Sequence, residues 1–195
     1  MNYSPIIAPI VEGHGEVAAV RQLITRIGEK LGIFIEVAQP FRLDSGKMRK
    51  REELDKAVRL QEVRVRGRAG GVLIVRDGDD DDVQCPVELA RQISPEPGAF
   101  SVPVEVVIAF HEYEAWFLAA AESLRCHSSV RSDATSPPNP ESKRNAKKQL
   151  ELMMNESYKE TLHQAKFSSL IDLDVAARNS RSFRRMMHAV EKLTS

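Results

Sequence analysis

The sequence predicts an α/β protein with a mainly parallel, four-stranded sheet flanked by helices and followed by a helical C-terminal extension. Three observations carry this prediction. Short apolar runs alternate with segments of helical spacing through about residue 125, an order typical of a parallel α/β sheet. Beyond residue 143 only helical spacing recurs. Hydrophobic residues make up 42% of the 195 residues, which suits a packed core and excludes a disordered or fibrous chain.

The strands are predicted from short apolar runs bounded by turn-forming residues. The first run ends at Glu12, and the glycines on both sides of His14 permit a sharp reversal of the chain. In the second run, Pro40 makes the far end a sheet edge or an exit from the sheet. The four expected strands span residues 6–11, 33–41, 72–75 and 102–110.

The helices are predicted from apolar residues that recur at steps of three and four. After Glu16 this spacing continues as far as Gly32, and glycine commonly follows the end of a helix. The other helices are expected from residue 52 onward, at 87–93, from about residue 112, and at 143–154, 156–165, 170–177 and 183–193.

Three regions are expected in the chain. Residues 1–125 form the α/β domain. Residues 126–142, which are rich in Ser, Pro and Asn and poor in large apolar side chains, are expected to be a loop or hinge. Residues 143–195 are expected to be a helical extension that packs on the same domain.

The overall charge excludes a general basic coat for nucleic acid or membranes, because 28 Lys and Arg balance 28 Asp and Glu. Residues 42–68 nevertheless carry ten Lys and Arg against five Asp and Glu, so this stretch either contacts a phosphate backbone or is a solvated face. With no secretory leader, no membrane span and two cysteines far apart (Cys85 and Cys126), the sequence favours a soluble cytoplasmic protein with free thiols.

Acidic residues follow two of the predicted strands. Glu12 and Glu16 come after the first strand, and Asp77 and Asp79 after the third. Ligands of open α/β sheets bind beyond the carboxyl ends of the strands. Two carboxylates about 4 Å apart repel by roughly 4 kcal/mol at an effective dielectric near 20, so such a cluster either holds protons or binds a cation. Oxygen ligands without His or Cys at zinc spacing favour Mg²⁺ or Mn²⁺.

Each acid also has a simpler interpretation. Glu16 also suits the positive end of a helix, and the acidic run from Asp77 to Asp82 also suits a solvated turn. Glu112, after the fourth strand, either assists metal or water binding or is an acid at a helix start. No comparable structural role accounts for an acid at Glu12, which lies between a buried strand and a glycine.

Two motifs carry a resemblance to a known family. The stretches IVEGHGE (residues 10–16) and IVRDGD (residues 74–79) resemble the Toprim domain of topoisomerases, bacterial primases and overcoming-lysogenization-defect (OLD) nucleases. This likeness covers roughly the first 120 residues. More closely, the chain resembles the Toprim-like family of domain of unknown function 4276, in the segments VEGHGEVAAV, DGDDDD, HEYEAWFLA, NAKKQL and SRSFRRM.

The resemblance implies roles for particular residues. Glu12 would be a general acid/base or a metal ligand, Asp77 and Asp79 would hold Mg²⁺ or Mn²⁺, and Glu16 would serve a second metal. Lys147 would close over a phosphate as a catalytic residue. The implied function is nuclease-like cleavage of phosphodiesters in nucleic acid, alone or with a separate ATPase. The alternatives are a non-catalytic metal-binding partner of an ATPase, and a hydrolase of small nucleotides.

Overall fold

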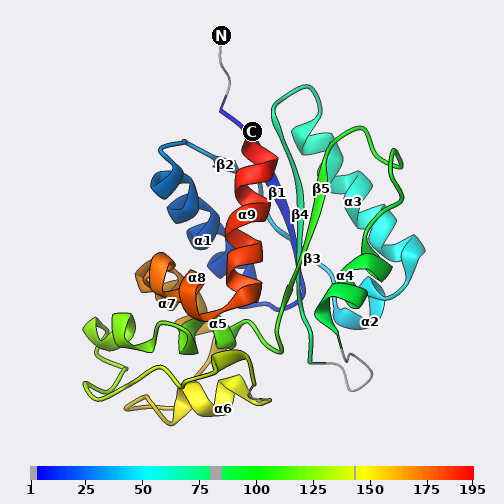
Figure 1. The fold of residues 1–195 in the computed structure, drawn as a ribbon. Coiled ribbons are helices and arrows are strands. Elements are labelled where there is room, and N and C mark those ends of the chain that lie inside the picture. The colour runs from blue at the N-terminus through cyan, green and yellow to red at the C-terminus, as the bar shows by residue number, and fades with distance from the viewer. Residues whose placement is uncertain (1–3, 80–84, 143) are drawn as a thin grey trace.

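The computed structural model describes residues 4–79, 85–142 and 144–195 (Figure 1). Its elements in chain order are β1 (Ile6–Val11), α1 (Glu16–Leu31), β2 (Glu36–Val37), β3 (Phe41–Arg42), α2 (Ser45–Met48), α3 (Arg51–Val65), β4 (Gly70–Asp77), α4 (Pro86–Ile93), β5 (Val104–Ala109), α5 (Glu114–Leu118), the 3₁₀ turns η1 (Ala121–Cys126) and η2 (Pro140–Ser142), α6 (Ala146–Glu151), α7 (Glu160–Leu170), α8 (Leu173–Asn179) and α9 (Arg181–Thr194). Within the described ranges, no helix has the length and apolar character needed to cross a membrane.

The strands form one sheet of five members in the order β2-β1-β4-β5, and β3 also pairs with β1. Every pairing between these strands is parallel. The predicted class, an α/β protein with a mainly parallel sheet flanked by helices, is therefore confirmed. The predicted number of four strands is wrong.

The extra strand arises because the predicted second strand, residues 33–41, is interrupted. In its place are β2, in the middle of this segment, and β3, which begins at its last residue; each is two residues long and pairs with β1. Pro40 lies just before β3 and has no amide hydrogen to donate to a ladder. At the break, the buried Gln61 amide of α3 donates to the carbonyls of Pro9 (2.6 Å) and Gln39 (3.1 Å), so a side chain replaces the missing ladder bonds.

Helices cover both faces of the sheet, which explains the apolar strands. Alternate residues of β1 and β4 enter two separate cores, so that Ile7 and Leu73 face one side and Ile10 and Ile74 the other. Helices α1, α7 and α9 lie on the first side and α2, α3 and α4 on the second (Figure 1). The C-terminal helices therefore complete a core that the first strand begins.

Two helices near the carboxyl edge begin later in the chain than the spacing predicts. The helix expected near residue 112 begins at Glu114 and is five residues long. The helix expected at 156–165 is α7, which spans Glu160–Leu170, after an extended stretch that includes Lys159. These shifts place Glu112 and Tyr158 outside helices, where their backbones and side chains contact other elements.

Candidate functional site

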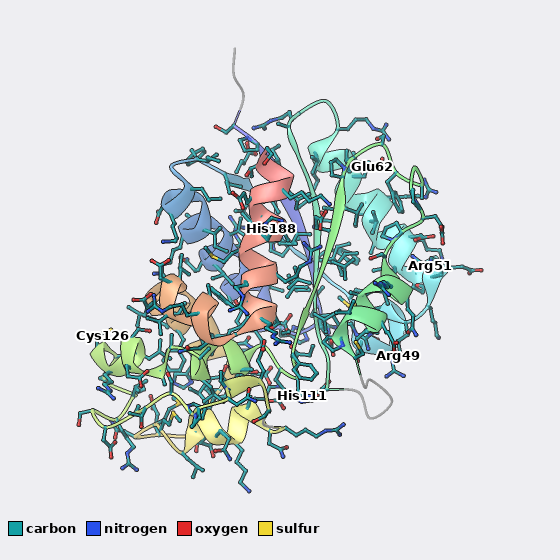
Figure 2. All side chains as sticks on the ribbon, in the orientation of Figure 1. Arg49, Arg51, Glu62, His111, Cys126 and His188 are labelled. Carbon is teal, nitrogen blue, oxygen red and sulfur yellow. The ribbon has the colours of Figure 1, made fainter. Side chains whose placement is uncertain are left out.

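The carboxyl ends of β1, β4 and β5 meet at one edge of the sheet. Ile10 of β1 pairs with Ile74 of β4, and Asp77 at the end of β4 pairs with Ala109 of β5. The Gly78 amide donates to the carbonyls of Ala109 (2.9 Å) and His111 (2.8 Å), which joins the turns that follow the two strands. His111 lies just below the end of β5, towards the helices beneath the sheet (Figure 2). This edge is where the sequence predicts a site.

Glu16 folds back onto the turn that follows β1. Its carboxylate accepts the amides of Glu12 and Gly13, each at 3.2 Å, and a Cβ atom on residue 13 would lie 2.8 Å from Glu16 Oε1. The Glu16 side chain is buried. Burial, with the nearby charges of Glu12 and Glu114, raises the pKa of Glu16 to about 8.

Asp77 is the central acid of the cluster. It is buried at the end of β4, and its Oδ1 accepts the amide of Tyr113 at 2.8 Å. Burial raises the pKa of Asp77 well above its ordinary value, and the charges of Glu16, Glu114 and Glu12 raise it further. Among the described groups, Lys147 opposes this by lowering the pKa. The cluster therefore concentrates negative charge in a place with little water.

Glu114 is an acid of this cluster that the sequence analysis does not name among the site residues. Its side chain is fully buried, and Oε1 accepts hydrogen bonds from the Tyr158 hydroxyl and the Gln164 amide, both at 2.8 Å. Its other oxygen, Oε2, is buried and accepts no hydrogen bond from the described residues. Burial raises the pKa of Glu114. The acidic segment after the fourth predicted strand contains this residue. In a helix that begins at residue 112, however, residue 114 would point away from the face that carries Glu112.

The partners of Glu114 are held in place by close packing of α7 against the start of α1. A Cβ atom on Gly15 would lie 2.3 Å from Gln164 Oε1 and 2.8 Å from the backbone of Glu160. Only a residue without a side chain allows this approach. Gly15 therefore serves the helix contact in addition to the turn after β1.

We expect the Tyr158→Phe variant to be destabilised by about 1–2 kcal/mol, because it removes a hydrogen bond to a buried carboxyl group. Urea unfolding at neutral pH measures this change. A double-mutant cycle with Glu114→Gln separates the bond from general packing. A coupling energy near zero between the two positions would show that the bond does not contribute to stability.

Glu12 lies beside Arg76, a fully buried arginine of β4 that the sequence interpretation also missed. Glu12 Oε2 is 3.8 Å from Arg76 Nε, and this oxygen accepts no hydrogen bond from the described residues. Burial raises the pKa of Glu12, whereas a hydrogen bond from Ser45 and the charge of Arg76 lower it. The Glu12 side chain retains 22% exposure, so solvent reaches this acid, which follows β1 directly.

Asp79 differs from Asp77 in its surroundings. It is exposed, and its charge contributes to the raised pKa of Glu12. Two acids two residues apart point to the same side only where the chain is extended, but β4 ends at Asp77. The acidic residues 80–82 of the same run lie outside the described residues.

Glu112 and Lys147 are joined through the backbone. Glu112 is buried, and its Oε2 accepts the Lys147 amide at 2.8 Å, at the start of α6. The Lys147 ammonium group pairs with Glu160 Oε1 at 2.8 Å. Burial alone would lower the pKa of Lys147, but Glu114, Glu160 and Asp77 raise it above its ordinary value. The lysine is therefore a fixed positive charge beside the acids.

The oxygen donors of this edge suit Mg²⁺ or Mn²⁺ in chemistry. Across residues 4–79, 85–142 and 144–195, no group of three His, Cys, Asp or Glu side chains is close enough to hold a metal ion. Mg²⁺ is, however, usually held by one or two carboxylates, with water and phosphate in its other positions. The unbonded oxygens of Glu12 and Glu114 are available for such an open site, and a closed protein cage is not formed.

Comparison with known proteins gives one match. The model of the family described as "Domain of unknown function (DUF4276)" matches residues 11–191. No curated protein and no solved structure matches the chain.

Proposed function

Because the chain belongs to the DUF4276 family, whose description gives no activity, we propose its function from its own residues: a Mg²⁺- or Mn²⁺-dependent phosphodiester hydrolase that acts on nucleic acid. One observation carries the proposal. At the carboxyl edge of a parallel sheet, burial raises the pKa of Glu16, Asp77 and Glu114, the charge of Glu114 raises the first two further, and Glu16 adds to the shift of Asp77, beside the partly exposed Glu12. Such a cluster is stable only when protons or a cation neutralise part of its charge.

A divalent cation bound here would polarise the phosphoryl oxygens and activate water. The carboxylate ligands would be one or two of Asp77, Asp79 and Glu16, with water and phosphate in the other positions of the cation. Glu112 would hold the start of α6 from the side. Glu12 is suited to carry a proton, because it reaches solvent and burial raises its pKa above the ordinary value. These roles agree with the resemblance to Toprim nucleases. The resemblance itself is part of the proposal.

Lys147 is suited to hold a phosphate close to these acids. It lines a cavity of about 460 Å³ together with Tyr158, Glu160 and neighbouring residues of α6 and α7. Its ammonium group is half-buried and pairs with Glu160. A phosphate that displaces Glu160 from this pair would gain a strong charge-assisted hydrogen bond.

A second candidate is a non-catalytic, metal-binding partner of an ATPase. The observation that favours it is the use of several acids in structural contacts. Glu16 accepts two backbone amides, Glu112 accepts one, and Glu114 accepts bonds from a tyrosine and a glutamine. Acids held in this way stabilise the edge whether or not it reacts.

Cleavage assays with the purified chain test these candidates. Labelled single-stranded and double-stranded DNA, RNA, and bis(p-nitrophenyl) phosphate are incubated with Mn²⁺, with Mg²⁺, or with a chelator, and calorimetry measures Mn²⁺ binding. The proposal predicts metal-dependent cleavage of a nucleic acid. Mn²⁺ binding without cleavage supports the second candidate, and cleavage of small esters alone supports a nucleotide hydrolase. Absence of both binding and cleavage contradicts every metal-dependent function.

A further inference from the structure

The outer edge of β5 presents backbone groups that have no strand beside them. β5 ends the sheet order, with β4 as its neighbour on one side. The carbonyls of Pro103 and Ala109 accept amides of residues 72 and 78, so odd-numbered residues of β5 face β4. Because peptide groups alternate along a strand, those of Val106 and Ile108 face outward. No described backbone group bonds to them. Val106 and Ile108 are each 4% exposed, so a further strand pairs with this edge only by displacing neighbouring side chains.

A cavity of about 990 Å³ lies along this edge, between α4 and the α8–α9 corner. Its floor is apolar and comes from the edge strand and the residue after it: Val106, Ile108 and Phe110. Val87 of α4 extends the apolar wall and is exposed. We call this cavity the β5 groove. It is separate from the acid cluster, because none of the acids described above lines it.

The lining of the β5 groove is positively charged. Four arginines of α8 and α9 line it, with Glu141 as the single acid among the described lining residues: Arg178, Arg181, Arg184 and Arg185. The carboxylate of Glu141 is already occupied, because it accepts the Ser180 hydroxyl at 2.8 Å and the amides of Arg181 (3.0 Å) and Ser182 (2.8 Å) at the start of α9. It does not neutralise the arginine side chains.

The arginines differ in how far they are committed to the fold. Arg185 pairs with Glu105, and Arg184 donates to carbonyls at the end of α8. Arg181 is exposed, and its guanidinium group makes no hydrogen bond or ion pair within the described residues. Arg181 is therefore a cation of the groove that is available to a ligand at no cost to the fold.

We propose that the β5 groove binds an acidic peptide segment of a partner protein in an extended conformation, as an added strand along β5. The outward amides and carbonyls supply main-chain hydrogen bonds, and the arginines select acidic side chains. The apolar floor suits alternate apolar residues of the same strand. A nucleic acid would match the charge, but it has no ladder of amide and carbonyl groups to pair with a strand edge.

Fluorescence anisotropy with synthetic peptides tests this proposal. The probe is a labelled peptide of alternating Val and Glu, about eight residues long so that it spans the edge strand at about 3.3 Å per residue. Three comparison probes are a Val–Lys peptide, the Val–Glu peptide with alternate backbone amides methylated, and a short single-stranded oligonucleotide. The full chain is compared with Arg181→Glu, and with Arg64→Glu as a control on an exposed residue of α3.

We expect saturable binding of the Val–Glu peptide, weakened roughly tenfold by Arg181→Glu and unchanged by Arg64→Glu. Methylation of the backbone amides should abolish binding, because it removes the ladder bonds. Equal binding of the methylated peptide, or no effect of Arg181→Glu, would overturn the proposal. Binding of the oligonucleotide in place of the peptide would also overturn it. Circular dichroism checks that each variant is folded, and Arg178→Glu replaces Arg181→Glu if the latter is not.

Discussion

The Glu12→Gln variant is expected to lose about a hundredfold to ten-thousandfold of any Mn²⁺-dependent cleavage rate. Glutamine keeps the size of the side chain but can neither take up nor release a proton at neutral pH. Glu12 is the acid that combines solvent access with a raised pKa and an unbonded oxygen. Initial rates of cleavage at saturating Mn²⁺ measure the loss.

The fold of this variant needs its own measurement. Removing the charge of Glu12 leaves the buried Arg76 with less neutralising charge, so a modest loss of stability accompanies the substitution. Glu12→Asp keeps the charge but shortens the side chain by one methylene group. We expect it to lose activity, with a smaller loss of stability than Glu12→Gln. Glu29→Gln, an exposed change at the other end of α1, is the matched control. If Glu12→Gln cleaves as fast as this control, Glu12 does not transfer the proton.

Stability should fall as the pH rises from about 5 to about 8 in the metal-free protein. The folded-state pKa of Glu16, about 8, lies above the ordinary value of 4.5. Between these values the folded protein keeps a proton that the unfolded chain has released, so each pH unit lowers the unfolding free energy by roughly 1.4 kcal/mol for one such group. This contribution is complete below pH 4.5 and lost above about pH 8.

Other acids set the lower limit of this range. Hydrogen bonds from Ser101 lower the pKa of Glu62. Burial alone would raise the pKa of Glu105, but its bonds to Lys192 and Arg185 lower it. Their contributions are lost as the pH falls below the ordinary carboxyl value. Maximum stability is therefore expected at roughly pH 5.

Urea unfolding across this pH range in a chelator measures the slope. Glu16→Gln, which imitates the protonated acid, should flatten it, and Glu29→Gln should not change it. Added Mg²⁺ should stabilise the protein more at high pH than at low pH, because a cation competes with protons for the same acids. A flat profile in the unsubstituted protein would show that the acids do not retain protons on folding.

The fold class was predictable because apolar runs and helical spacing report burial directly. Residues 6–11 coincide with β1, since a strand buried on both faces reads as an uninterrupted apolar run. Residues 33–41 read as one strand for the same reason, but the interruption between β2 and β3 depends on the side chain of Gln61, which lies in α3. A pattern along one segment contains no information about that contact.

The site was predictable as far as it depends on strand ends. Glu16 and Asp77 do meet at the edge that the strand order indicates, where the charge of Glu16 raises the pKa of Asp77. Glu114 was missed because the phase of a five-residue helix cannot be read from its spacing. Arg76 was missed because a charged residue inside an apolar run gives no sign of its partner. Both depend on tertiary contacts.

The hydrogen bonds of Glu114 can form only late in the synthesis of the chain. Its two hydrogen-bond donors, Tyr158 and Gln164, come 44 and 50 residues later in the chain. A ribosome that has finished the whole sheet has therefore not yet supplied the groups that hold this acid, nor the helix that packs against Gly15. Incomplete chains released before α7 lack an assembled acid pocket, so, under the proposed function, a prematurely terminated product would have no cleavage activity.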